Sequence, residues 1–175
     1  RAEATAGFVD NFRGFRVPPE ENLPFLPLAI DKPTSDAMLA GVGADDWSWD
    51  PASKTFAFGS DGVAETTLFP HNTGAAGNFG TVDIGTTDNS TSDLARQILN
   101  GITPQDMAAL PDGKLAFNSS GELFLNGDTG ISAGVKDELA SIKGEPKVIP
   151  IFTQVNGPGN NATYTIVKFV GIRIM

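Results

Sequence analysis

The C-terminal stretch, residues 145–175, has the clearest hydrophobic pattern in the chain. Residues 163–175 are rich in β-branched and aromatic side chains that alternate with a period of two, as expected of a strand. Val167 and Phe169 make the second face apolar too, which is typical of a central strand. A loop of Asn, Gly and Pro over 156–161 predicts a hairpin with the preceding apolar run. The face that we expect to be buried consists of Tyr164, Ile166, Val170 and Ile172.

Prolines interrupt two other apolar runs. Pro150 lies inside the first strand of the closing hairpin, and because proline has no N–H, we expect that strand at a sheet edge or bulged there. Residues 23–30 carry two prolines, so we expect an edge strand or an extended arm.

Alternating apolar positions predict further hairpins. Trp47 and Trp49 alternate before an Asp-Pro turn, and Phe56 and Phe58 alternate after it. A third strand is expected over 63–69 and a short one over 80–85. A second hairpin is predicted around the turn at 118–121, with Leu115 and Phe117 in one strand and Leu123 and Leu125 in the other.

Capping residues and helical spacing predict three or four short helices. The expected helices cover residues 33–41, 90–100, 103–110 and 132–144. Ser90 or Ser92 is expected to cap the second of them, where Ser90-Thr-Ser-Asp93 resembles a capping box. Ser132 is expected to cap the last. Phe8, Phe12 and Phe15 have a spacing that suits a short helix near the N-terminus.

Helices and hairpins therefore alternate without the strand–helix–strand rhythm of a doubly wound sheet. The pattern predicts an α+β fold, with a mostly antiparallel sheet built from hairpins and three or four short helices. We expect an N-terminal arm over residues 1–22 and a single domain over 23–175. The chain opens at Arg1, and we interpret it as a piece of a longer product.

Composition excludes several classes of partner and of catalytic site. The net charge is −9 and no cluster of Lys or Arg occurs, so nucleic acid and anionic membrane surfaces are poor partners. The chain has no cysteine, which excludes thiolate catalysis and cysteine zinc sites. His71 is the only histidine, and we expect a solvated loop residue there.

Two glycine- or acid-rich segments suggest ligands, and each has a simpler interpretation. The glycines of 74–80 lead into a strand instead of a helix and lack a Walker lysine, so a close backbone crossing or tight turn explains them better than a phosphate loop. Asp45, Asp46 and Asp50 lack the spacing of a calcium loop and are expected to be exposed carboxylates.

The segment Asp88-Asn-Ser-Thr-Ser92 leaves two interpretations open. It matches the Asp-x-Ser-x-Ser pattern with which von Willebrand A-type domains hold a divalent ion. In those domains the aspartate follows a buried strand directly, whereas residues 85–87 intervene here. The simpler interpretation is a helix cap without metal, and the alternative is a divalent-ion-dependent adhesion module.

Catalysis by carboxylates alone is a further alternative. A pair of them could hydrolyse an envelope glycan, and Trp47 and Trp49, two residues apart, could form a sugar platform beside such a pair. We expect these tryptophans in the core instead, because two exposed tryptophans on one face would form an unusual apolar patch.

The segment Gly77-Asn-Phe-Gly-Thr-Val-Asp-Ile-Gly85 begins with Asn-Phe-Gly after a glycine and has Ala76 before it. It is similar to the PGNFG segment of TadE/TadG-like proteins of Flp (tight-adherence) pilus assembly, with Ala76 in place of the proline. Further similar segments are the helix over 92–101, the loop over 126–136, the Pro-Phe strand over 23–30, and the closing segments 148–152 and 164–174.

The resemblance implies an extracytoplasmic structural or interaction domain, in the periplasm or at the cell surface. It implies partners among other pilus or envelope proteins, and a membrane attachment only through an N-terminal helix that this chain lacks. It supplies no catalytic, cofactor or metal residues, so we expect no enzyme activity and no cofactor.

Overall fold

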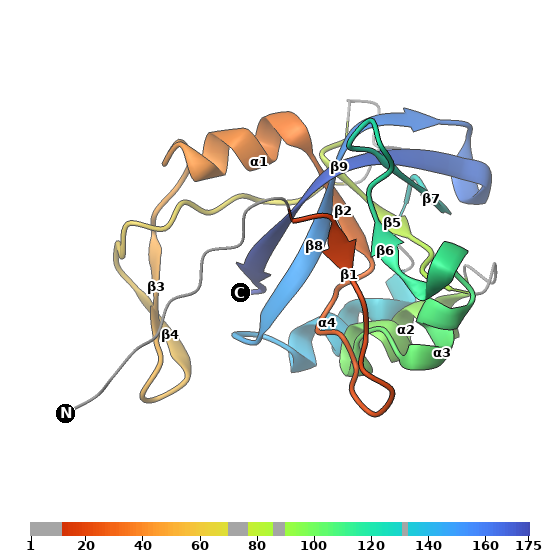
Figure 1. Ribbon diagram of the computed structural model, residues 1–175. Coiled ribbons are helices and arrows are strands. Elements are labelled where there is room, and N and C mark those ends of the chain that lie inside the picture. Colours follow the sequence, from red (N-terminus) through yellow and green to blue (C-terminus); the bar gives the residue numbers. More distant parts are fainter. Residues whose placement is uncertain (1–11, 70–76, 86–89, 131–132) are drawn as a thin grey trace.

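Five strands close into a barrel at the centre of the structure, a computed structural model that describes residues 12–69, 77–85, 90–130 and 133–175 (Figure 1). The strands are β2, β5, β7, β9 and β8 in that order around the barrel. Their bounds are Leu28–Asp31, Phe79–Val82, Leu123–Asp128, Ala162–Arg173 and Pro146–Asn156. All neighbours are antiparallel except β2 and β8, which run parallel and close the barrel.

The predicted closing hairpin is confirmed as β8 and β9, the longest strands of the fold. They pair from Pro146 with Arg173 to Asn156 with Thr163. Of the four predicted core residues, Tyr164 and Ile166 are fully buried, whereas Val170 and Ile172 are half-buried because β9 extends beyond the barrel there.

The edge positions expected for the two proline-containing strands are wrong. β8 pairs with β9 on one side and β2 on the other, and its register shifts lie around Phe152, past Pro150. Pairing with the residue 23–30 segment continues on either side of Pro150, from Phe25 with Val148 to Ile30 with Ile151. The barrel tolerates Pro150 because the chain pairs around the missing N–H.

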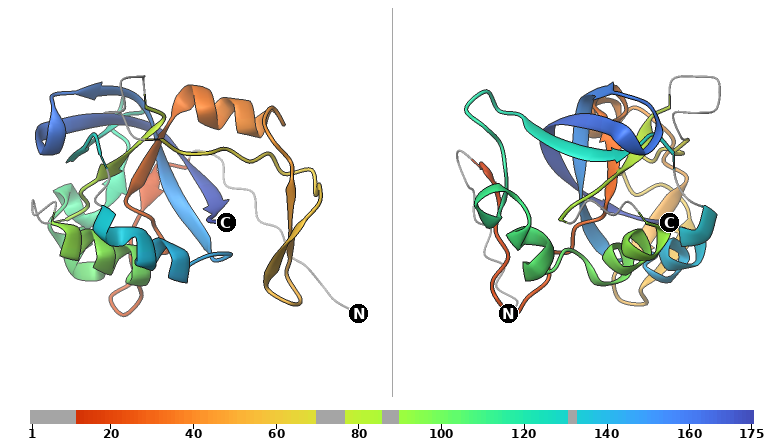
Figure 2. Two further views of the ribbon diagram at one scale, coloured as in Figure 1. Left: turned by 180° about the vertical axis from the view of Figure 1, so that it is seen from behind. Right: turned by 90° about the vertical axis from the view of Figure 1, so that its right-hand side faces the viewer.

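Large side chains fill the barrel interior. The helices over residues 91–100, 104–108 and 136–141 lie at one end of the barrel (Figure 2). Tyr164 and Phe152 meet edge to face in the interior, with ring centroids 5.1 Å apart. A second apolar cluster lies between the barrel wall and the helices. It includes Leu94, Ile98, Val135, Ile142, Ile149 and Ile151.

The four expected helices form, although they are shorter than predicted at several ends. They are α1, α2, α3 and α4, which span Lys32–Leu39, Thr91–Asn100, Pro104–Ala108 and Lys136–Ser141. Single 3₁₀ turns cover Pro111–Gly113, Ala133–Val135 and Gly159–Asn161. Ser132, the predicted cap of the last helix, lies outside the described residues.

The predicted hairpin around residues 118–121 is wrong. The turn forms, but the strand before it, β6 (Leu115–Ala116), pairs with β1 (Gly14–Phe15), while β7 pairs inside the barrel. Aromatic packing explains the exchange, because Phe15, Phe117 and Phe169 gather with centroids about 5 Å apart. The N-terminal segment thus replaces β7 as the partner of β6.

Two further predictions, the N-terminal helix and the strand over 63–69, are wrong. Phe12 and Phe15 lie in a loop and a strand, not a helix, and Phe8 lies outside the described residues. The strand expected over 63–69 is reduced to one bridge between Ala44 and Glu65.

Strands and helices are both present and the pairing is mostly antiparallel, in accord with an α+β fold whose sheet is closed into a barrel. Within the described ranges, no helix combines the length and apolar character needed to span a membrane.

Candidate functional site

A two-stranded hairpin stands apart from the barrel and forms one wall of a groove (Figure 1). Its strands are β3 (Trp47–Asp50) and β4 (Thr55–Phe58), as the alternation of aromatic residues predicts. The turn between them is held by Asp50, whose carboxylate accepts bonds from Ala52 N at 2.9 Å and Ser53 Oγ at 2.6 Å. The hairpin therefore has a local reason to form without support from the barrel.

Cross-strand pairing gathers four aromatic side chains on one face of this hairpin. Trp47 is opposite Phe58 and Trp49 is opposite Phe56, with ring centroids 5.9 Å and 4.8 Å apart. Aromatic pairs of this kind stabilise a sheet by about 0.2–1 kcal/mol each. The two pairs define what we call the aromatic face: Trp47, Trp49, Phe56 and Phe58.

The aromatic face is anchored to the barrel at one end only. The Trp49 ring packs against Gly144 so closely that a Cβ at that position would overlap it. The Arg173 guanidinium lies 5.4 Å from the centroid of the same ring, in cation–π geometry, and its Nε donates to the Gly144 carbonyl at 3.1 Å. At the other end, Phe58 is 81% exposed and Trp47 is 44% exposed.

The prediction that Trp47 and Trp49 lie in the core is therefore wrong. Trp47 is exposed and Trp49 is half-buried. Trp49 packs on Gly144 and Arg173, whereas Trp47 and Phe58 at the other end of the face remain exposed.

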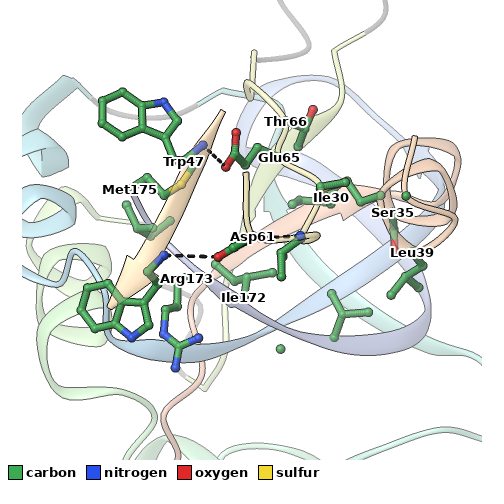
Figure 3. Close-up of a pocket in the computed structure, with 18 of the residues that line it drawn as sticks. Ile30, Ser35, Leu39, Trp47, Asp61, Glu65, Thr66, Ile172, Arg173 and Met175 are labelled. Atoms are coloured by element: carbon green, nitrogen blue, oxygen red, sulfur yellow. Dashed lines mark hydrogen bonds between the residues drawn. The ribbon is translucent and has the colours of Figure 1, made fainter. Parts of the chain in front are cut away.

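Between the hairpin and the barrel lies a groove with a volume of about 990 Å³ (Figure 3). Its floor and walls come from α1, β3, the segment 61–68, and the ends of β8 and β9. Exposed apolar side chains that line this groove are Leu39, Trp47, Val63 and Met175.

Helix α1 is fixed on the barrel side of the groove. Asp31 caps it by accepting a bond from Thr34 N at 3.1 Å, and Pro33 occupies its first turn. Lys168 of β9 donates to the Asp36 carboxylate at 2.9 Å, which ties the helix to the barrel wall. The hydrogen bonds from Lys32 and Lys168 lower the pKa of Asp36, so this carboxylate is charged at neutral pH.

Two carboxylates accept hydrogen bonds from backbone N–H groups along the outer edge of β3, the edge that does not pair with β4. Glu65 accepts bonds from Trp47 N at 2.9 Å and Asp46 N at 3.0 Å, and Asp61 accepts one from Trp49 N at 3.2 Å (Figure 3). The second Asp61 oxygen accepts a bond from Val63 N at 3.0 Å. All four oxygens thus serve backbone N–H groups, which gives these two carboxylates a structural use beside the tryptophans.

Negative charge surrounds the hairpin. Residues 43–66 contain five carboxylates and one lysine, a net charge of −4 within a chain of net charge −9. The hydrogen bond from Ser60 lowers the pKa of Asp45, and the bond from Ser53 lowers the pKa of Asp50. The groove is therefore lined mostly by apolar residues and lies beside an acidic stretch of the chain.

A second charged cluster joins α2 to α3. Arg96 donates to Asp93 at 2.6 Å and to Asp106 at 2.8 Å. Asp106 also completes a reciprocal capping box with Thr103 at the start of α3. Burial raises the pKa of Asp106, but the hydrogen bonds from Arg96 and Thr103 outweigh it and hold that pKa below 3.8. This cluster fastens two helices together.

The segment considered for metal binding, residues 88–92, lies only partly within the described residues. Asp88 lies outside the described residues, and Ser90 caps α2 by accepting a bond from Asp93 N at 3.2 Å. The reciprocal half of a capping box is not found at this helix, since the Asp93 carboxylate binds Arg96 and Gln97. Within the described ranges, no three acidic or histidine side chains are placed to hold a metal ion.

Two further sequence predictions concern the glycine-rich segment 74–80 and the single histidine, His71. His71 and residues 74–76 lie outside the described part of the chain. The predicted explanation is a backbone crossing or tight turn, but the close approach at Gly80 is mainly to a side chain, because a Cβ there would overlap the hydroxyl of Tyr164.

Sequence reasoning missed the groove because its parts come from distant segments. Nothing in the spacing of Arg173 indicates that it covers Trp49, which lies in the other half of the chain. The pair Asp61 and Glu65 carried a usable signal, because two carboxylates follow the hairpin closely along the chain.

Comparison of the chain with known protein families, with curated proteins and with solved structures finds no match. The groove and its aromatic face are therefore interpreted from their own geometry.

Proposed function

We propose that the chain is an extracytoplasmic structural and interaction domain of a pilus-assembly-related envelope protein, similar to TadE/TadG-like proteins. Its partners are other pilus or envelope proteins, and a helix outside this chain attaches the whole protein to the membrane. The domain works by contact and carries out no catalysis.

One observation supports this proposal above the others: the open aromatic face beside the groove. Monomeric proteins rarely leave large contiguous apolar patches exposed, and such patches with polar rims are typical of interaction sites. Here Phe58 of the aromatic face and the groove residues Val63 and Leu39 are each more than 60% exposed. Aromatic residues of this kind are enriched where partners bind.

The positions of the resembling segments also support the proposal. Residues 77–85 form β5 and its extension, and residues 148–152 and 164–174 lie in the closing hairpin. These segments build the barrel wall, as expected of structural motifs shared by a family of non-catalytic domains. The hairpin of β3 and β4 lies outside them, where partner specificity would be placed, whereas the groove beside it also includes residues 170–174 of the closing segment.

Chemistry at the groove gives no comparable support for catalysis. Asp61 and Glu65, the carboxylates beside the tryptophans, hold backbone N–H groups. The pKa values of Asp36, Asp45, Asp50 and Asp106 are all lowered, whereas a general acid for glycoside hydrolysis needs a raised pKa.

Site-specific photo-crosslinking in cells tests the proposal. A photoreactive residue replaces Val63 on the groove rim, and a matched one replaces Phe124, which is 56% exposed on β7, in a bacterium that assembles Flp pili and carries the gene. We expect a crosslink from position 63 to a pilus or envelope protein and none from position 124. Equal crosslinking at both positions would contradict a specific contact surface.

The extracytoplasmic location of the domain is tested in the same cells. Protease added to spheroplasts should degrade the domain while cytoplasmic proteins survive. Protection of the domain in intact spheroplasts, or release of soluble fragments from peptidoglycan by the purified chain, would overturn the proposal.

A further inference from the structure

We propose that the outer edge of β4 accepts an extended, positively charged segment of a partner protein as a third strand of the hairpin sheet. This inference rests on the proposed contact function and specifies how the contact is made. It identifies the partner by its chemistry: a strand-forming segment with lysine or arginine on one face and apolar residues on the other.

Hydrogen-bond geometry shows that one edge of β4 has no strand beside it in the described part of the chain. In an antiparallel pair, opposed residues alternate between those bonded to each other and those whose N–H and C=O point outward. Trp47 and Trp49 send their N–H groups away from β4, to Glu65 and Asp61. Their partners Phe58 and Phe56 must therefore also direct their backbone groups outward, on the opposite edge of the sheet.

The two edges of the hairpin are treated differently. Carboxylates occupy the outward N–H groups of β3, whereas those of Phe56 and Phe58 have no partner among the described residues. Natural sheets protect exposed edges with charged side chains, proline or bulges. The sequence of β4, Thr-Phe-Ala-Phe, contains none of these.

The barrel offers no alternative site for strand addition. Its described strands close on themselves, so each has a neighbour on both sides. A third strand on β4 would place alternate side chains beside Phe56 and Phe58 and extend the aromatic face. Strand addition of this kind takes affinity from main-chain bonds and specificity from alternate side chains.

Charge determines which kind of segment can pair with the outer edge of β4. The hairpin region carries −4, so pairing of β4 with β4 of a second copy would bring two such charges together. Like charges at an interface suppress wrong partners, and opposite charges favour association. A basic segment is attracted to this acidic region, in which Asp46 and Asp50 adjoin the tryptophans of β3.

A peptide titration tests the inference on the whole chain. The probe is a short synthetic peptide of alternating lysine and valine, and its controls are the glutamate–valine peptide and a lysine–valine peptide with alternate backbone nitrogens methylated. We expect saturable binding of the first peptide, seen as shifts of the Phe56 and Phe58 amide signals and of Trp47 fluorescence. Methylation removes at least one to two backbone bonds, so binding should weaken about tenfold or more.

Protein variants provide an independent arm. Phe58→Pro removes an outward N–H without removing a bond to β3, so it should abolish binding, whereas Phe58→Ala keeps the N–H and should retain it in weaker form. Asp46→Asn should weaken binding more than Asp112→Asn, which removes the same charge at an exposed site outside the groove.

The outcomes separate this inference from the proposed function. Equal binding of the methylated peptide, binding of the glutamate peptide, or no binding of the lysine peptide would overturn strand addition, even if crosslinking at position 63 still identifies an envelope partner. Self-association in sedimentation that is lost in Phe58→Pro would also overturn it, because a second copy would then be the occupant.

Discussion

The hydroxyl of Tyr164 donates a hydrogen bond to the backbone carbonyl of Asp128, with 2.9 Å between the two oxygens. The Tyr164 ring is fully buried in the barrel, where two glycines on neighbouring strands leave room for it. A Cβ at Gly80 would overlap the hydroxyl, and a Cβ at Gly127 would press on the ring edge. Tyrosine and glycines therefore fit as one unit across β5, β7 and β9.

Replacement of Gly80 by alanine should destabilise the protein by about 1–3 kcal/mol, because the added methyl overpacks the barrel. Tyr164→Phe should cost about 0.5–1.5 kcal/mol through the lost hydrogen bond. Since Phe lacks the oxygen that the methyl would meet, the double variant should lose less than the sum of the two. Urea unfolding of the single and double variants measures this coupling.

Gly171→Ala is the matched control, because a Cβ at this position of β9 meets nothing within 4 Å. It should change the free energy of unfolding by no more than about 0.5 kcal/mol. Strict additivity of Gly80→Ala and Tyr164→Phe would show that the close approach does not constrain the barrel.

Ile166 tests the central position of β9. Its side chain is fully buried, and it pairs with Leu123 on one side and Phe152 on the other. Ile166→Ala should cost about 2–5 kcal/mol in denaturant unfolding, the range for a buried large-to-small change. Phe124→Ala, an exposed position on the neighbouring strand, should cost far less, and comparable losses would place Ile166 outside the core.

The sequence predicts this hairpin well, because its signal is local. Alternation, β-branched residues and an Asn-Gly-Pro loop all lie within residues 145–175. The helices are predictable for the same reason: the caps at Asp31, Ser90 and Thr103 act within three residues along the chain.

Barrel closure is not predictable in this way. The parallel pair of Ile30 with Ile151 joins segments more than a hundred residues apart, and alternation does not specify which strand is the neighbour. The same ambiguity explains why Leu115 pairs with Phe15 and not across the adjacent turn. At the groove, the pattern identifies the hairpin but not whether the Trp47 face is buried or open.

Acid stability should depend on Asp106. Its pKa in the folded protein is below the ordinary value of 3.8, so its contribution to stability is present at neutral pH. That contribution is lost as the pH falls from about 4 through the lower folded pKa, because the unfolded state then binds more protons. Asp106→Asn should reduce the slope of stability against pH in this window.

Urea unfolding between neutral pH and about pH 3 measures that slope, and Asp112→Asn controls for the loss of one negative charge. The Asp112 side chain is 77% exposed and contacts only Lys114 among the charged groups described. An unchanged slope in Asp106→Asn would show that the bonds from Arg96 and Thr103 do not favour the charged carboxylate.

The cap of α2 should depend on Ser90 and not on Ser92. Ser90 accepts the Asp93 N–H, whereas the hydroxyl of Ser92 contacts only that of Ser90, at 3.1 Å, among the bonds described. Ser90→Ala should destabilise the protein by about 0.5–2 kcal/mol, and Ser92→Ala by less. Thermal unfolding of both variants compares them.

Calorimetry distinguishes this cap from a metal site. We expect no saturable heat when calcium or magnesium is titrated into the chain. Saturable binding that disappears in Asp88→Ala would contradict the cap-only interpretation and favour the adhesion module instead.

The anchor of the hairpin should be separable from the stability of the barrel. Arg173 lies over Trp49 and donates to the Gly144 carbonyl, so Arg173→Ala removes the contacts that hold one end of the aromatic face. A cation–π contact at a partly exposed site is worth about 0.5–1 kcal/mol, so amide exchange of Ser48 and Asp50 should accelerate about two- to fivefold. Exchange of Tyr164 and Ile166 amides should not change, because the barrel core does not contact this anchor.

The matched control is Lys143→Ala, which removes an exposed basic side chain next to Gly144. Equal acceleration in both variants, or acceleration throughout the barrel, would show that the hairpin is not held through Arg173 and Trp49.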